Sequence, residues 1–360
     1  MLDACKRQWS GPPVLDPLES RLLLDAAVPL PEGALRLSSS LATRAAVWSD
    51  PTGPRRADAP PAAGQESGDV WYVRPFGGNY GQENGASYFN AWDGLQNIVW
   101  GPGGVDAGDT LYVCGLHDGF DAGRGYDNTQ LVVGASGVEG SPITIRGDYP
   151  GDPGWVFRCN RVVKSFTSYG QYGLWGNTGV YGGTGRLCHE DNVPLPYPKT
   201  GLPDATWEAG SFWHDSANHT LYYKPTDGQD PNGGAHTLQT SHDTALIIQN
   251  QSWIVLAGLT MSGASTSNGV LKLSNADHIV VEDCLIRYSR MKGIVIVDDS
   301  DDGVIRDCEI TQVGSGIYSY LSGSHDDRCD GWLIANNEIH YTGRWIWDDG
   351  SDNHAIGWQD

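Results

Sequence analysis

One short turn of the sequence, Asp298-Asp-Ser-Asp-Asp-Gly303, is crowded with oxygen-bearing side chains. Carboxylate oxygens are the ligands that Ca²⁺ prefers, and alternate residues of this turn match part of an EF-hand loop. An EF-hand also needs helices on both sides, whereas residues 294–297 and 304–310 are β-branched runs that predict strands. We therefore reject an EF-hand and expect either a Ca²⁺ site made of turn carboxylates or a solvated turn. The candidate metal ligands are Asp298, Asp299, Asp301 and Asp302.

A basic cluster, Arg287-Tyr-Ser-Arg-Met-Lys292, stands just before this turn. Cationic side chains neutralise carboxylates, and burial beside other cations lowers the pKa of a lysine toward that of a working general base. A short basic cluster is also common on surfaces that bind nothing, so both interpretations stay open. The candidate catalytic residues here are Arg287, Arg290 and Lys292, and the candidate substrate-binding residues are Tyr288 and the downstream Arg328.

Three polar residues recur nine positions after a glycine: His278, Asp302 and His325. If these glycines mark equivalent points of stacked repeats, the three side chains form a column of imidazole, carboxylate and imidazole. A metal ion or a general acid–base pair could use such a column. The alternative is a set of polar turn residues that align without a function. His325 therefore joins the candidate catalytic residues.

Two tryptophans, Trp345 and Trp347, are two residues apart and share one face of a strand. With Tyr341 they form either a platform for sugar rings or part of a core, because aromatic faces serve both purposes. His354 begins the next repeat and would extend the same surface. Trp345, Trp347 and His354 are therefore candidate substrate-binding residues.

Internal repetition predicts the elements that must position these side chains. Residues 269–286 align with residues 293–310, so that Cys284 and Cys308 are 24 residues apart. A third copy begins at Gly316 and resumes at 332–339, and an earlier copy covers 245–259. Each copy contains short β-branched strands and cannot bury its own apolar face, so the copies must stack. A β-sandwich is the alternative.

The repeat register makes two specific predictions. Glu282 stacks on Arg306 as an outward pair of opposite charge. Cys284 and Cys308 lie in the column that continues at Asn337, which makes them buried spacers and not nucleophiles.

The rest of the chain divides into a lead-in and one domain. Residues 1–67 are rich in proline and alanine and predict a flexible segment, and residues 68–360 predict a single domain. Within that domain, residues 88–100 predict a helix that caps the open end of the stack, with Trp92, Leu95 and Val99 on one face. Residues from about 150 to 240 predict a long irregular insertion with a hairpin at 212–224, and the clear repeats run from 241 to 360. Because the sequence stops beside a strand-like run, we expect further coils downstream.

The pattern of the repeats, with the extended strand, capping helix, "GDTLYV" and "PITIR" segments before them, resembles the pectate-lyase-like superfamily. That resemblance implies an all-β fold, a right-handed parallel β-helix (solenoid) with an N-terminal capping helix and a long irregular insertion. It also implies a polysaccharide partner. Lyases of this superfold remove the proton α to a uronate carboxylate with an arginine or lysine base, while Ca²⁺ or cationic side chains neutralise the carboxylate.

A second resemblance lies near the N-terminus. Residues 14–27 resemble the LEPR-xLL motif of large bacterial exoproteins, with Ser20 in place of the motif's proline. The resemblance implies export, and hence an extracellular or cell-surface location in a bacterium.

Composition narrows the partners. With 23 Lys+Arg against 44 Asp+Glu the formal net charge is −21, which repels nucleic acid. No stretch of 18 apolar residues predicts a membrane span. The seven cysteines form no Cys-x-x-Cys pair, so a zinc ribbon or thioredoxin-like site is excluded. We expect a monomer.

Three functions remain open at this point. The favoured one is a lyase that cleaves a uronate-containing polysaccharide by β-elimination. A glycoside hydrolase with paired carboxylates, such as Asp301 and Asp302, is the second. The third is a non-catalytic surface or adhesin module that binds glycans.

Overall fold

The computed structural model describes residues 68–118, 130–161, 165–169, 173–178, 187–199, 201–215, 217–233, 236–320, 329–343 and 354–358. Almost all regular structure in these ranges is β-strand, and most strand pairs are parallel, which confirms that part of the expected fold class. The helical residues described form three-residue 3₁₀ turns, η3 (Tyr88–Asn90), η4 (Leu95–Asn97) and η6 (Pro231–Gly233). No helix in these ranges is long and apolar enough to cross a membrane.

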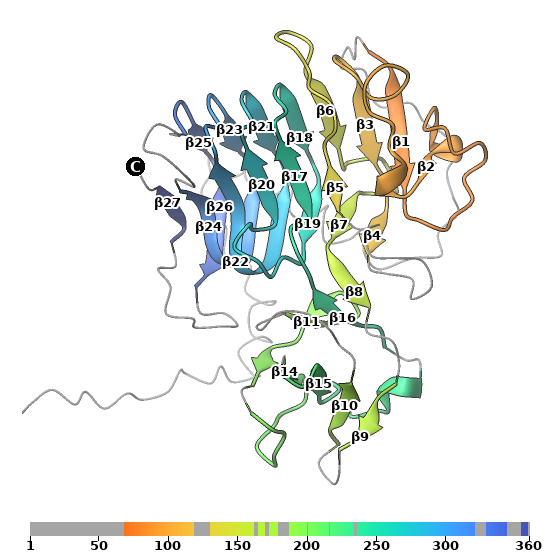
Figure 1. The fold of residues 1–360 in the computed structure, drawn as a ribbon, viewed down its shortest axis with the longest axis vertical. Coiled ribbons are helices and arrows are strands. Elements are labelled where there is room, and N and C mark those ends of the chain that lie inside the picture. The colour runs from red at the N-terminus through yellow and green to blue at the C-terminus, as the bar shows by residue number, and fades with distance from the viewer. Residues whose placement is uncertain are drawn as a thin grey trace, which may run out of the picture. The chain divides into compact units, whose positions relative to one another are not determined.

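One parallel sheet collects strands from successive turns of the chain (Figure 1). Short runs rich in Val, Ile and Leu suit strands that are covered on their inner face. In spatial order the strands are β2 (Trp92–Asp93), β1 (Val70–Arg74), β3 (Thr110–Val113), β6 (Ile143–Arg146), β18 (Ile254–Ala257), β21 (Ile279–Glu282), β23 (Val304–Arg306) and β25 (Leu333–Ala335).

A second sheet is also parallel. Its longest strand, β22 (Leu285–Val297), pairs with different strands at its two ends. β22 pairs through its first residues with β19 and through its last residues with β20. The strands are β4 (Leu116–Asp118), β7 (Trp155–Phe157), β19 (Thr260–Ser262), β22 (Leu285–Val297), β20 (Leu271–Ser274), β17 (Leu246–Gln249) and β5 (Leu131–Val132), with β24 (Glu309–Ser319), β26 (Glu338–Thr342) and β27 (Ile356–Trp358) joined through β24.

The main core is made of side chains from both parallel sheets. In successive strands, residues of similar type lie directly beside one another. Leu256 pairs with Val281, and Ile286 pairs with Ile310. These side chains are fully buried in one continuous apolar cluster. Each coil therefore depends on its neighbours for burial, as the repeat predicts.

The register predictions are confirmed in the coils that carry the repeat. Val281 pairs with Ile305, and Arg306 donates hydrogen bonds from Nε and Nη2 to Glu282 Oε2 at 3.0 and 2.5 Å. Cys284 and Cys308 are buried and free. In the next coil Asn337 accepts a hydrogen bond from the Cys308 N–H, which continues the column of spacers.

The register of β21 and β23 places His278 beside Asp302, the first two members of the predicted column, whereas the third member, His325, lies in a longer coil. Val304 pairs with Leu333, 29 positions later, so this coil is longer than the preceding one. Gly331 lies against Asp302. His278 stacks instead on Trp253, with ring centroids 4.0 Å apart. His325 itself lies outside the described residues.

The predicted capping helix over residues 88–100 is also wrong. The segment forms η3, the short strand β2 and η4, and Trp92 pairs with Val73. Gly94 interrupts the helical pattern with a φ of 93°, a conformation that favours glycine. Trp92 and Leu95 are buried as expected, but Val99 is 46% exposed and Ile98 is buried in its place.

The segment predicted as an irregular insertion contains two small, mainly antiparallel sheets. One comprises β12 (Val193–Pro194), β11 (Cys188–Glu190), β16 (Leu238–Ser241) and β8 (Cys159–Arg161). The other comprises β13 (Tyr197–Pro198), β14 (Ser211–Asp215), β15 (Thr220–Tyr223), β10 (Trp175–Thr178) and β9 (Thr167–Ser168). The predicted hairpin is confirmed, since β14 and β15 pair antiparallel and Asp215 faces Thr220 across the turn.

Candidate functional site

The basic cluster of the sequence lies on the single strand β22. Arg287 pairs with Ser262 of β19 and Thr311 of β24, whereas Lys292 pairs with Ser315 of β24. The register between β22 and β24 shifts between Ser289 and Lys292. An irregularity in the hydrogen-bond ladder therefore separates Arg287 from Lys292. Before it β22 pairs with β19, and after it β22 pairs with β20.

Lys292 lies against aromatic rings. Its Nζ is 4.3 Å from the ring centroid of Tyr318 and 4.5 Å from that of Tyr320. Burial lowers the pKa of Lys292 below its ordinary value. No described residue forms an ion pair with its amine, so no carboxylate opposes this shift in the described residues.

The ladder places His354 in the same column as Lys292. Lys292 pairs with Ser315, and the Ser315 hydroxyl accepts a 3.4 Å hydrogen bond from the His354 N–H. Adjacent parallel strands are about 4.8 Å apart, so Lys292 and His354 are roughly 10 Å apart along the stack. His354 is exposed. Lys292, predicted as catalytic, and His354, predicted as substrate-binding, thus occupy one column of the stack, two strands apart.

Arg287 belongs to a second arrangement, which we call the arginine–aromatic cluster (Trp155, His189, Arg287 and Tyr288). The Arg287 guanidinium carbon lies 4.7 Å from the Trp155 ring and 4.7 Å from the Tyr288 ring. The Trp155 Nε1–H donates a 2.6 Å hydrogen bond to the Ser262 hydroxyl, which fixes its ring. No described residue accepts a hydrogen bond from the Arg287 guanidinium, and its Nε is buried.

The insertion completes this cluster. His189, on β11, is fully buried, and its ring centroid lies 5.8 Å from that of Tyr288. Burial, with a further contribution from the Arg287 charge, lowers the pKa of His189 to about 3, so the imidazole stays neutral. Tyr288, predicted as a substrate-binding residue, is only 9% exposed and supports Arg287 from the core side. Arg290 is half-buried on the same strand, with its N–H donating to the Ala264 carbonyl.

The acidic turn is used largely for backbone hydrogen bonding. The Asp301 N–H donates to Asp277 Oδ1, and the Asp330 N–H donates to Asp301 Oδ1, so aspartates of three coils cap one another's turns. Ser274 donates to Asp298 Oδ2 at 2.5 Å. Burial, and then the charges of Asp299, Asp277 and Asp330, raise the pKa of Asp301. Among the described residues, the predicted ligands Asp298, Asp299, Asp301 and Asp302 do not form a set of three convergent metal-ligand atoms.

A pair of carboxylates that the sequence prediction missed lies on β24 and β26. Glu309 pairs with Glu338, and His340 Nε2 is 3.3 Å from Glu309 Oε1 and 4.0 Å from Glu338 Oε1. His340 pairs with Thr311, which pairs in turn with Arg287. The repeat alignment placed Glu309 in a strand, but it carried no signal for the pairing with Glu338.

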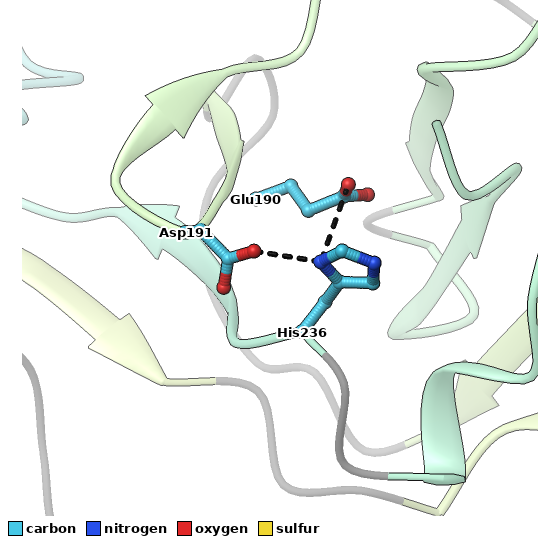
Figure 2. A group of neighbouring side chains, drawn as sticks. All are labelled: Glu190, Asp191 and His236. Atoms are coloured by element: carbon cyan, nitrogen blue, oxygen red, sulfur yellow. Dashed lines mark hydrogen bonds and ion pairs between the residues drawn. The ribbon is translucent and has the colours of Figure 1, made fainter. Parts of the chain in front are cut away.

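Three potential metal-ligand side chains converge in the insertion: Glu190, Asp191 and His236 (Figure 2). The hydrogen bonds to Asp191 and Asp227 raise the pKa of His236 to about 9. His236 and Asp191 are 45 positions apart in the sequence, and no motif links them. The remaining predicted site residues, His325, Arg328, Trp345 and Trp347, lie outside the described residues.

Comparisons with known proteins show the fold. No family model matches the chain, and no curated protein matches it. The complex of XylC with xylose aligns with a TM-score of 0.54 and 12% identity over 78% of this chain. A structure described as a glycoside hydrolase aligns with a TM-score of 0.54 and 10% identity, covering 77% of this chain and 74% of that one. An alginate lyase from Paenibacillus sp. str. FPU-7 aligns with a TM-score of 0.35 and 14% identity, covering 75% of this chain and 57% of that one.

At these identities the likeness to XylC and to the glycoside hydrolase is one of fold. The chain spans 55% of the length of XylC. The class that fold and comparisons define is thus an almost all-β protein with parallel sheets.

Proposed function

We propose that this protein is an exported, carbohydrate-active right-handed parallel β-helix that cleaves a uronate-containing polysaccharide by β-elimination. The observation that carries the proposal is Lys292, a half-buried amine with a lowered pKa and no acidic partner among the described residues. The LEPR-xLL resemblance supports export to the extracellular space or the bacterial cell surface. The net charge of −21 argues against nucleic acid as a partner, and we propose a monomer.

β-Elimination needs a base that is neutral before it acts. It removes the proton α to the uronate carboxylate, and the carbon–oxygen bond at the β position then breaks to leave an unsaturated sugar. A lysine whose pKa is lowered by burial has a larger fraction of free amine near neutral pH, which suits this role. The tyrosine rings under Lys292 favour its charged form through cation–π attraction, so burial must outweigh them for the amine to act.

The uronate carboxylate must be neutralised while the proton leaves. The Arg287 guanidinium has no described hydrogen-bond acceptor, and its carbon lies 4.7 Å from each of two aromatic rings, which restrict its movement. Arginine is suited to a carboxylate because its donors match both oxygens. Arg290 on the same strand adds positive charge, and His354 extends the contact surface along the stack.

Ca²⁺ is the cofactor that the acidic turn predicts. The turn carboxylates of Asp298–Asp302 accept hydrogen bonds from neighbouring coils and do not converge as three ligands. Ca²⁺ at this turn stays a proposal from the sequence, and no step of the mechanism is assigned to it.

Glycoside hydrolysis is the second candidate. Glu309 and Glu338 face the same imidazole from adjacent strands, and one carboxylic acid with one carboxylate is the equipment of a glycosidase. The two comparison structures with TM-scores of 0.54 are a xylose complex and a glycoside hydrolase, which supports a glycan as the ligand.

Product analysis separates the candidates. The purified chain is incubated with pectate, alginate, glycosaminoglycans and neutral glycans, with Ca²⁺ or with a chelator. Ultraviolet absorbance from an unsaturated uronate, abolished by Lys292→Ala but retained by Lys272→Ala, is the result we expect. Lys272 is a matched control, because it lies on β20 beside Val295 and outside the proposed site.

New reducing ends without that absorbance, lost in Glu309→Gln, would replace the lyase by the hydrolase. Glycan binding without cleavage of any substrate would leave a non-catalytic surface module.

A further inference from the structure

The three convergent side chains of the insertion come from two paired strands. Glu190 ends β11, Asp191 follows it, and His236 stands just before β16. The antiparallel pairing of Glu190 with Leu238 brings these segments together. His236 Nδ1 is 2.6 Å from Asp191 Oδ2 and 3.7 Å from Glu190 Oε1, so two carboxylates face one ring nitrogen (Figure 2).

The atoms on the far side of each group are held by other parts of the protein. His236 Nε2 is 2.9 Å from Asp227 Oδ2, and Asp191 Oδ1 accepts a 2.7 Å hydrogen bond from the Thr237 N–H. Glu190 Oε2 accepts hydrogen bonds from the Tyr223 hydroxyl and the Thr226 N–H, and Oε1, which faces the imidazole, accepts one from the Thr226 hydroxyl. Metal-binding imidazoles and carboxylates in proteins are oriented by outer partners of this kind. When a metal ion replaces the proton on Nδ1, Asp227 would keep the hydrogen on Nε2.

The charge of the cluster also favours a bound cation. Three carboxylates surround one imidazole, and among the described residues none of the three is paired with a lysine or an arginine. Even with a protonated histidine, the group therefore carries an excess of two negative charges. Glu190 is only 7% exposed, so water screens its charge poorly. A divalent cation in place of the proton removes most of this excess.

We propose that Glu190, Asp191 and His236 bind a divalent transition-metal ion, with Asp227 as the residue that positions the imidazole. One nitrogen and two oxygen donors suit Zn²⁺ or a neighbouring transition metal, whereas Ca²⁺ prefers oxygen ligands throughout. Zn²⁺ ligands lie about 2.0–2.2 Å from the ion, so tetrahedral ligand atoms are roughly 3.3 Å apart. The contact of Nδ1 with Asp191 opens, and that with Glu190 closes, by less than about 1 Å to reach this geometry.

The ion would join the end of β11, the start of β16 and the loop that holds Asp227. The Asp191 side chain is 50% exposed, which leaves one side of the site open for water as a fourth ligand. The site lies within the small antiparallel sheets and uses none of the residues proposed for polysaccharide cleavage. The role of the metal site is to stabilise the insertion, and the proposal of this site does not depend on the proposed lyase activity.

Zinc binding by the full chain tests the proposal. The protein is stripped with a chelator and titrated with Zn²⁺, and the melting temperature is measured with and without the metal. We expect one equivalent to bind and the melting temperature to rise. Asp227→Asn should weaken binding by about 10- to 100-fold, since it removes only the outer partner. Asp230→Asn, a change in a neighbouring exposed aspartate that hydrogen-bonds only within its own turn, should leave binding unchanged.

Cobalt identifies the ligands without relying on a variant that must fold. Co²⁺ bound to nitrogen and oxygen shows weak visible bands and no sulfur-to-metal charge transfer in the near ultraviolet, and His236→Gln should remove these bands. Cysteine-type charge transfer, binding that survives His236→Gln unchanged, or failure of the folded wild-type protein to bind Zn²⁺ would each overturn the proposal.

Discussion

Replacing His117 by leucine is expected to make the folded protein less sensitive to acid. His117 lies on β4 and pairs with Val156, whose side chain belongs to the main core. It is 2% exposed, and the Cys114 backbone, which raises the pKa of His117, only partly offsets the effect of burial. Burial lowers the pKa of His117 to about 3.

The sign of the effect follows from the direction of this shift. An unfolded histidine titrates near pH 6.5, and the folded one takes up a proton only near pH 3. The stabilising contribution is therefore complete above about pH 6.5 and falls as the pH drops toward 3, because only the unfolded chain binds the proton. Relative to neutral pH, the loss is about 1.4 kcal/mol at pH 5.5 and about 2.7 kcal/mol at pH 4.5.

Urea denaturation followed by tryptophan fluorescence at about pH 7.5 and 5.5 measures this difference. Other groups also titrate in the interval, so the informative quantity is wild type minus His117→Leu. We expect the variant to lose about 1.4 kcal/mol less on acidification than the wild type. His219→Gln, at an exposed turn, serves as the control and should follow the wild type. Equal losses in wild type and His117→Leu would refute the buried neutral imidazole.

Three further outcomes are expected. Ile305→Ala in the core should lower the free energy of unfolding by about 2–5 kcal/mol. Leu333→Ala, at a side chain that is 58% exposed, should change it by less than about 0.5 kcal/mol. Denaturant unfolding measures both values, and similar losses in the two variants would contradict the assigned register. Under the proposed lyase activity, kcat/KM should rise with pH to a midpoint below the ordinary lysine pKa of 10.5, since burial lowers the pKa of Lys292, and a midpoint at or above that value would exclude it as the base. Arg287→Ala should reduce kcat/KM on a uronate polymer about 10- to 100-fold, the effect of losing one charge-assisted hydrogen-bonding partner. The same variant should have little effect on binding of a neutral glycan. Equal losses on both ligands would argue for a structural role.

The repeat made the strand register predictable. The 24-residue spacing of Cys284 and Cys308 was sufficient to pair Glu282 with Arg306, because a period of short strands can bury its apolar face only by stacking on itself. The alternation of the chain around residues 211–223 was likewise sufficient for a hairpin. Each of these predictions depends on residues close in sequence or one coil apart.

Irregular elements could not be predicted in the same way. The helix expected at 88–100 failed because Gly94 at positive φ and the pairing of Trp92 with Val73 outweigh a helical spacing of apolar residues. The 29-residue step from Val304 to Leu333 was not predicted either, because a change of coil length leaves no periodic signal.

The sequence by itself determined that short, mutually dependent strands stack on one another, and it singled out Lys292 and Arg287, which the structure places on one strand. Only the tertiary structure decided what surrounds them. It placed tyrosine rings under Lys292, brought His189 from the insertion to the arginine–aromatic cluster, and joined Glu190 and Asp191 to His236. The physical reason is the separation in sequence of the residues in contact. The pattern of buried residues repeats in every coil and can be recognised locally. Contacts between the insertion and the coils join distant segments, and no local pattern encodes them.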